Sequence, residues 1–384
     1  MIGKKWLKAV LICCLVLLLS TPALAETIRI AVASPFTGAL AGYGDNVKDG
    51  VTLKVEEINA QGGIDGKEIR VEWMDEQCEP REAATVSSRI AQNRNIVGVV
   101  GHLCSSAHLA ALPAYLRHGV PVVAPTTTAV SISEQSKDRS GKTWAFRVVY
   151  RDDYQGEFLA RYVNEVLGLE NIAVFYENND YGIGLKDAFI NKANELGLNI
   201  VGQEAYVSGS SDFNPQLTRL RGRNPDGLFI SGYYPEGALI AGQADNLGMK
   251  VAKFGADGFD NVDYISLAGS AAENTYLTVP FLADAAEGEA KEFLENFRNR
   301  FNREVDWMSA NAYDAAGILL QAIAEAGADR AKVREYIATI NSPENAYEGI
   351  AGLTYFNDKG DTLKPAFVKM VKDGQFVAAP VQMD

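Results

Sequence analysis

Two loops rich in hydroxyl groups are the first candidates for chemistry in this sequence. Gly101-His102-Leu103-Cys104-Ser105-Ser106 and Pro125-Thr126-Thr127-Thr128 each follow a short apolar run with the character of a β-strand. Serine hydroxyls and free backbone N–H groups at the start of a helix suit a carboxylate or another small anion. The alternatives are a helix N-cap at Ser105 or Ser106 and an ordinary turn at the threonines.

Three tyrosines stand in equivalent places, each in a predicted loop before a helix. They are Tyr43, Tyr181 and Tyr233, and Pro235 suits the first turn of the helix after Tyr233. One loop tyrosine usually packs against its neighbours. Three in equivalent positions indicate the wall of a cleft, because a tyrosine ring is apolar with a polar tip.

A single carboxylate completes the candidate site. Asp257 lies in Gly255-Ala256-Asp257-Gly258-Phe259, between small residues and after a predicted strand. It could pair with a cationic group of a ligand. On spacing alone, a helix N-cap at Asp257 has about equal weight.

The sequence motifs of enzymes are missing. There is no G-x-S-x-G and no H-E-x-x-H, and the chain has three histidines. Gly141-Lys142-Thr143 imitates the end of a phosphate-binding loop, but Ser136 stands where that loop begins with glycine, and Gly182-Ile183-Gly184 lacks the third glycine of a dinucleotide fingerprint. We therefore expect no catalysis, no metal and no cofactor.

The elements that must position these loops alternate between strand and helix. Strands are predicted over residues 28–33, 68–74, 96–100, 120–124, 172–176, 228–230 and 251–254, and amphipathic helical patterns lie between them, such as Val47, Val51, Val55 and Ile58. This alternation predicts doubly wound α/β lobes with parallel sheets. About ten strands are too many for one comfortable sheet, so two lobes are expected. Open sheets of this kind bind ligands at the carboxyl ends of their strands.

The first 25 residues have the pattern of a cleaved signal peptide rather than of a membrane anchor. Lys4, Lys5 and Lys8 precede a short apolar run that ends before Ala23-Leu24-Ala25. The run is shorter than the roughly 20 residues that span a bilayer. Cleavage after Ala25 would change the net charge from −13 to −16. A chain this acidic, without a dense basic run, is a poor partner for nucleic acid or anionic membranes.

Two cysteines remain in the exported chain, Cys78 and Cys104. An even pair in an oxidising compartment usually forms a disulfide. The rival interpretations are a catalytic thiol and a metal pair, and a metal would need further ligands that do not accompany Cys78.

The chain resembles the type I periplasmic solute-binding proteins of ABC transporters, and within them the branched-chain amino acid (Leu/Ile/Val) binding proteins. The resemblance runs through Ser34–Gly38, Ile58–Ile64, Gly101–Ser106, Asp180–Gly182 and Gly232–Glu236. It implies two Rossmann-like lobes joined by crossover strands at a hinge, a disulfide between Cys78 and Cys104, and a ligand enclosed between the lobes. The expected lobes are 26–147 plus 280–351 and 148–279 plus 352–384.

The resemblance also implies a role for each candidate residue. Ser105 and Thr128 would hold the α-carboxylate of an amino acid, and the Thr126 carbonyl, the Thr128 hydroxyl and Asp257 would hold its ammonium group. A zwitterion taken out of water needs each charge paired separately, which agrees with this assignment. The side-chain pocket would be lined by Tyr43, Leu103, Tyr181 and Tyr233.

Some residues depart from the pattern of these relatives. Asp257 stands where they typically have glutamate, and Thr126 and Thr127 stand where alanine is common. His108 replaces a small polar residue, and we expect it on a helix surface. These departures bear on Leu/Ile/Val specificity more than on amino-acid binding.

The expected function is capture of an apolar amino acid in the periplasm and delivery to an ABC permease by a monomer, with no reaction catalysed and no stable membrane insertion of the mature chain. One alternative is a sensor of the same fold that presents its ligand to a receptor. Others are a transport protein for amides, urea or aromatic acids and an exported enzyme, which the missing motifs disfavour.

Overall fold

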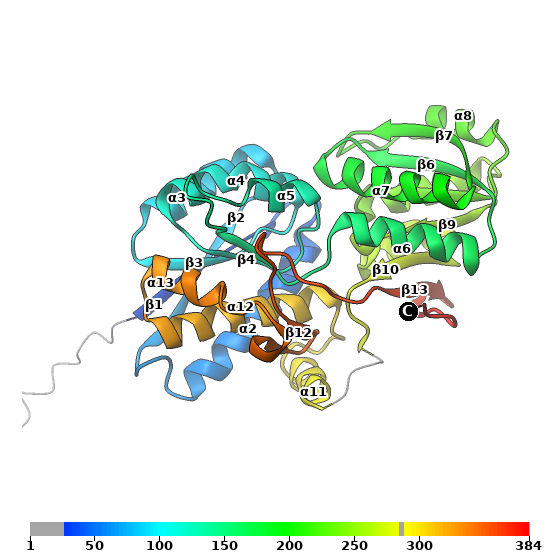
Figure 1. The fold of residues 1–384 in the computed structure, drawn as a ribbon. Helices are drawn as coiled ribbons and strands as arrows, with labels where there is room; N and C mark the ends of the chain where they lie inside the picture. The colour runs from blue at the N-terminus through cyan, green and yellow to red at the C-terminus, as the bar shows by residue number, and fades with distance from the viewer. Residues whose placement is uncertain (1–26, 284–287, 384) are drawn as a thin grey trace, which may run out of the picture.

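The computed structural model describes residues 27–283 and 288–383 and contains two α/β lobes side by side (Figure 1). The expected signal peptide lies outside the described residues. Each lobe is built on a sheet with helices on both faces, so the predicted doubly wound α/β class is confirmed.

The first lobe holds a parallel sheet of five strands in the order β2-β1-β3-β4-β5. Its strands are β1 (Thr27–Ser34), β2 (Glu68–Asp75), β3 (Ile96–Gly101), β4 (Val122–Ala124) and β5 (Ala145–Arg147). The early helices of this lobe are α2 (Ala41–Ala60), α3 (Pro80–Gln92), α4 (Ser105–His118) and α5 (Val130–Gln135).

The second lobe holds a sheet of seven strands in the order β14-β13-β10-β9-β8-β6-β7. Its strands are β6 (Asn171–Glu177), β7 (Asn199–Tyr206), β8 (Gly227–Ser231), β9 (Ala252–Gly255), β10 (Thr275–Val279), β13 (Phe367–Lys372) and β14 (Gln375–Ala378). Its helices are α6 (Asp152–Glu165), α7 (Asp180–Leu196), α8 (Asn214–Arg221), α9 (Tyr234–Asn246) and α10 (Val262–Ala268), with the 3-10 turns η1 (Asp257–Phe259) and η2 (Gly269–Ala272). The predicted Asp-Gly hairpin is present, because β13 and β14 pair antiparallel across Asp373 and Gly374.

The chain returns to the first lobe for three later helices, α11 (Glu289–Phe301), α12 (Trp307–Ala326) and α13 (Arg330–Ile337). Helix α12 is buried along most of its length, because its sequence is apolar on all sides. It packs closely against α2, where the Ser309 carbonyl leaves no room for a side chain at Gly50. The 3-10 turn η4 (Pro343–Asn345) and the short pair β11 (Tyr347–Gly349) and β12 (Gly352–Thr354) follow.

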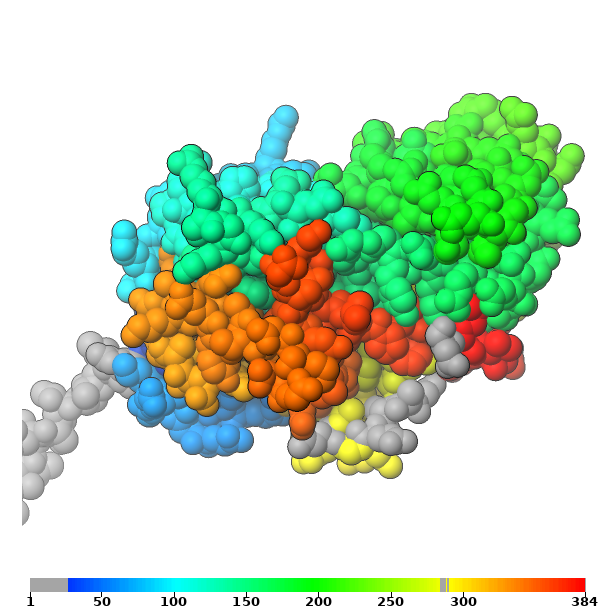
Figure 2. All heavy atoms as spheres, in the orientation of Figure 1, coloured from blue at the N-terminus to red at the C-terminus, as the bar shows by residue number. Residues whose placement is uncertain are grey.

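The segment after β12 stays with the first lobe before it enters β13 (Figure 2). The Phe356 N–H donates to the Ile340 carbonyl (2.8 Å), and the Arg147 N–H donates to the Gly360 carbonyl (2.9 Å). Our expected division placed everything after residue 351 in the second lobe, so these contacts move residues 352–361 to the first. The other expected lobe boundaries stay a prediction.

Candidate functional site

A small, partly open cavity lies where the two lobes meet, and candidate residues from both lobes line it. Its volume is about 20 Å³, close to the space of one water molecule. The first lobe contributes loops at the carboxyl ends of β3 and β4, and the second contributes the starts of α7, α9 and η1. The lining residues are Leu103, Ser105, Thr126, Thr128, Tyr181, Tyr233, Asp257, Gly258, Trp307 and Met308.

All eight predicted binding residues except Tyr43 therefore line one cavity. Tyr43 lies just behind the wall, where its hydroxyl donates to the carbonyl of Gly258. The roles of these residues toward a ligand stay predictions, but the fold brings them together from both lobes.

Ser105 opens helix α4 and faces the cavity. Its hydroxyl oxygen accepts a hydrogen bond from the Ala129 N–H (3.3 Å), which leaves the hydroxyl proton free to donate into the cavity. Cys104 is the N-cap residue, and no side chain caps α4, so the N-cap interpretation of Ser105 and Ser106 is wrong. The free N–H groups and the dipole at this helix start favour a negative charge in the cavity.

Ser106 instead makes a bond between the lobes that the sequence analysis missed. Its hydroxyl donates to Oδ2 of Asp180 (2.6 Å), and its oxygen is within reach of the Asp180 N–H (3.2 Å). Asp180 is the first residue of α7. This contact links the start of a helix in one lobe to the start of a helix in the other.

The three threonines of the second loop serve different purposes. The Thr126 hydroxyl donates to the Leu103 carbonyl (2.9 Å), so it ties the two loops of the first lobe together. The carbonyl of Thr128 accepts from the Asp152 N–H (2.9 Å) at the start of α6. The Thr127 hydroxyl lies 3.0 Å from Nδ1 of His108.

His108 is fully buried, so our expectation of a surface helix residue is wrong. Burial lowers the pKa of its imidazole well below the ordinary value, which keeps the ring neutral. His102 beside it lies 2.9 Å from the Tyr115 hydroxyl and 3.3 Å from a carboxylate oxygen of Glu76, and all three are buried. Through His102, this polar cluster joins the Gly101–Ser106 loop to α4 and to the segment after β2.

Asp257 is buried at the start of η1, and one of its oxygens has no partner. Oδ1 accepts from the Tyr181 hydroxyl (2.5 Å) and from the Gln155 amide (3.3 Å), whereas Oδ2 is buried and unpaired. Burial raises the pKa of this carboxyl to about 6. Asp257 caps no helix, because the next helix, α10, is capped by Asn261. The unpaired oxygen is suited to accept from a cation in the cavity.

The aromatic wall is continuous. The rings of Tyr181 and Tyr233 stack with centroids 5.0 Å apart, and Tyr43 meets Tyr233 edge-on at 6.2 Å. Tyr43 and Tyr181 lie in the first turns of α2 and α7 rather than in loops, and Tyr233 is the N-cap residue of α9. Burial raises the pKa of all three phenols well above the ordinary value, so they stay neutral.

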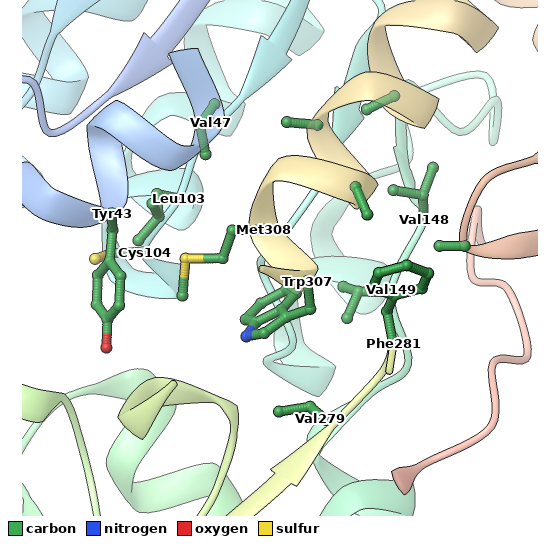
Figure 3. Close-up of a cluster of buried hydrophobic side chains, with 14 of the residues drawn as sticks. Tyr43, Val47, Leu103, Cys104, Val148, Val149, Val279, Phe281, Trp307 and Met308 are labelled. Carbon is green, nitrogen blue, oxygen red and sulfur yellow. The ribbon is translucent and has the colours of Figure 1, made fainter. Parts of the chain in front are cut away.

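Trp307 and Met308 complete the wall, and the sequence analysis missed both (Figure 3). They form the first turn of α12, which follows the Asp306 N-cap. The one available signal was this capping pattern before an apolar helix, and it carries no information about a ligand. The chain crosses between the lobes after β5 and after β10, and Val149, Val279 and Phe281 of these crossing segments lie beside Trp307. The Trp307 indole N–H is buried without a partner.

The predicted disulfide between Cys78 and Cys104 is present, with Cα atoms 5.4 Å apart. It fixes the start of α4, and with it Ser105, to the segment after β2. Across the described ranges, no group of three or more His, Cys, Asp or Glu side chains could hold a metal ion. No helix in those same ranges is both long and apolar enough to cross a membrane.

Two α/β lobes meet over a small cavity that is lined by residues of both. The family described as periplasmic binding protein matches residues 27–375, and this chain belongs to it.

Several proteins similar to this chain are named for branched-chain amino acids. The chain is 30% identical to the Leu/Ile/Val-binding protein of Escherichia coli over 92% of this chain and 93% of that one. A leucine binding protein from Thermotoga maritima superimposes with a TM-score of 0.85 at 31% identity, covering 93% of this chain and 99% of its own. The branched-chain amino acid transporter substrate binding protein from Streptococcus pneumoniae, solved with isoleucine, gives 0.85 at 30% identity, covering 93% and 100%.

Proposed function

We propose that this protein captures an apolar amino acid in the periplasm and delivers it to an ABC permease. The observation that carries the proposal is the presence of separate polar groups for a negative and a positive charge in a cavity whose lining is otherwise mostly apolar. Ser105 and the start of α4 offer donors for a carboxylate, and Asp257 offers an unpaired carboxylate oxygen for an ammonium group. A zwitterion needs both, because each of its charges loses water on entry.

The rest of the wall supports an apolar side chain. Leu103, Met308, Tyr181, Tyr233 and Trp307 line the rest of the cavity. The Thr126 hydroxyl is engaged with backbone carbonyls, so it adds little polarity to the pocket. The relatives that bind leucine and isoleucine make branched-chain amino acids the first ligands to test.

The cavity of about 20 Å³ is too small for leucine, so the lobes must separate to admit a ligand. Hinge closure follows from ligand contacts with both lobes, which favour the closed state. A permease that recognises the closed pair of lobes would then receive loaded protein. We propose that the exported chain acts as a monomer after cleavage behind Ala25.

Isothermal titration calorimetry of purified, refolded protein tests the proposal. The panel holds the twenty amino acids together with acetamide, urea and benzoate. We expect saturable binding of leucine, isoleucine or valine. Binding of acetamide, urea or benzoate alone would overturn the amino-acid assignment, and so would an absence of binding by every compound.

A further inference from the structure

A second buried carboxylate lies directly behind the cavity wall. Asp152 is the first residue of α6 and has no exposed surface. Its backbone N–H donates to the carbonyl of Thr128, which lines the cavity. Asp152 is therefore one residue away from any ligand that contacts Thr128.

Gln155 joins Asp152 to Asp257. Its amide nitrogen lies 3.3 Å from Oδ1 of Asp257 and 3.5 Å from Oδ1 of Asp152. Its amide oxygen accepts from the hydroxyls of Tyr150 (2.7 Å) and Thr278 (3.2 Å). These partners fix the orientation of the amide, so both carboxyl groups share a single neutral donor group.

The two carboxyl groups lack compensating charge. Oδ2 of each is buried without a hydrogen-bond partner. Arg147 acts on Asp152 from a distance, but its guanidinium is engaged elsewhere. It contacts Asp361 at 2.8 Å and donates to the Thr127 and Ala129 carbonyls and to the Ser133 hydroxyl.

The other groups that face the pair do not supply a cation either. Tyrosines approach from the segment between β5 and α6, from α2, from α7 and from the start of α9. Acids approach from α6 and from the residue after η1, and their own cations, Arg151 and Lys369, pair with these acids and not with Asp152 or Asp257. These groups are Tyr43, Tyr150, Tyr181, Tyr233, Asp153 and Asp260.

Two buried carboxyl groups in this setting cannot both be ionised at low cost. Burial raises the pKa of Asp257 to about 6. Burial raises the pKa of Asp152 well above its ordinary value, and the negative charge of Asp257 adds to the rise. In this closed arrangement, the proton that the pair holds near neutral pH therefore resides mainly on Asp152.

We propose that Asp152 and Asp257 act together as a proton-holding pair of the binding site, and that the cationic group of the ligand displaces the proton. Asp257 contacts the ligand, and Asp152 is a positioning residue that acts through Gln155 and Thr128. The inference rests on the proposed function, because it needs a ligand with a cationic group.

The consequence is a binding affinity that depends on pH. Below the raised pKa, the ligand must displace a proton before it can bind, whereas above it the carboxylate is ready. With a pKa near 6, affinity for L-leucine should fall about tenfold from pH 7 to pH 5. The ammonium group of the ligand stays protonated over this range, so the change arises in the protein.

Calorimetry of the wild-type chain with L-leucine at about pH 6, in buffers of different ionisation enthalpy, counts the protons released. We expect release of about half a proton or more per ligand. Asp152→Asn should still bind at pH 7 and should release fewer protons on binding, because the amide cannot share the proton. Asp187→Asn, on the exposed face of α7, is the matched control and should behave as the wild type.

Each outcome decides the matter. Binding without proton release by the wild type overturns the pair but leaves the proposed function intact. Unchanged proton release in Asp152→Asn would show that Asp152 does not share the proton. If neither L-leucine nor any other amino acid binds at pH 7, the proposed function falls and this inference falls with it. Proton release by the wild type is measured without any variant, so the proposal can be contradicted even if Asp152→Asn fails to fold.

Discussion

Asp257 couples binding to a cost in stability. Its buried oxygen has no hydrogen-bond partner within the protein, which lowers the stability of the fold, and a cation in the cavity would supply that partner. Functional sites commonly trade stability for activity in this way. Ser105 shows the complementary arrangement, because its oxygen accepts from Ala129 and its proton is left for a ligand.

Asp257→Asn should weaken binding of L-leucine by about 100-fold, because it removes one partner of a buried charge pair. It should also raise the melting temperature of the ligand-free protein at pH 8. A carboxyl whose folded pKa is raised destabilises the fold as pH rises from about 4 through 6, by about 2 to 3 kcal/mol. The neutral amide removes that cost.

Calorimetry and thermal unfolding at pH 8 and pH 4 check this prediction. The stability gain should become small at pH 4, where the folded carboxyl group is protonated and the unfolded one is about half protonated. Unchanged affinity in Asp257→Asn would contradict the assigned ammonium role.

Ser105→Ala should weaken L-leucine binding by about tenfold, because a hydrogen bond to a charged group contributes about 1.5 to 3 kcal/mol. L-leucinamide lacks the carboxylate, so the same substitution should change its weaker binding much less. Calorimetry with both ligands forms a double-substitution cycle. An equal loss for both ligands would show that Ser105 does not hold the carboxylate.

At the scale of the elements, the close packing of α2 on α12 positions the site. Tyr43 lies at the start of α2, and Trp307 and Met308 lie at the start of α12. A Cβ atom at Gly50 would come 2.1 Å from the carbonyl oxygen of Ser309, so the two helix backbones approach more closely there than any other residue allows. The site therefore depends on a contact outside it.

Gly50→Ala should destabilise the protein by about 2 kcal/mol or more, because backbone atoms must shift to make room. Gly242→Ala in helix α9 is the control, since nothing lies within 4 Å of its added Cβ atom. That change should be neutral or stabilise by up to about 1 kcal/mol, through lower chain entropy in the unfolded state. Urea unfolding of both variants tests the contrast, and equal stabilities would refute it.

At the scale of the whole molecule, hydrogen bonds join the two lobes across the cavity, and one of them runs from the Tyr43 hydroxyl to the Gly258 carbonyl. Ser106 bonds to Asp180, and the Tyr234 hydroxyl donates to the Ala39 carbonyl (3.0 Å). The crossing segments around Val149 and Phe281 carry apolar side chains that pack near Trp307 (Figure 3). Such a junction can open without unfolding either sheet, because each lobe has a buried apolar cluster of its own in addition to the cluster that runs across both.

Ser106→Ala should shift the ligand-free protein toward the open state by about five- to tenfold, since it removes one hydrogen bond to a charged group. We expect a larger radius of gyration in small-angle X-ray scattering without ligand, and a return to the wild-type value with saturating L-leucine. Ser208→Ala, at an exposed serine after β7, is the control. No difference between Ser106→Ala and the control would exclude a role in closure.

The sequence by itself determined the local elements and the chemistry carried by single loops. Short apolar runs predicted the strands at 28–33, 96–100 and 172–176, because such runs depend only on which faces are buried. Ser105 and Asp257 could be chosen because ligand groups gather at the carboxyl ends of parallel strands. The family pattern then supplied the pairing of Cys78 with Cys104.

Only the tertiary structure determines which residues come together where the two lobes meet. His108 has the spacing of a surface residue, yet it is buried beneath the threonine loop. Trp307 carries no local mark of a site, and it reaches the cavity because α12 returns to the first lobe. Asp152 and Asp257 are 105 positions apart in the sequence, and Gln155 joins them only after folding. Contacts between distant segments depend on how two lobes close, and no local pattern contains that information.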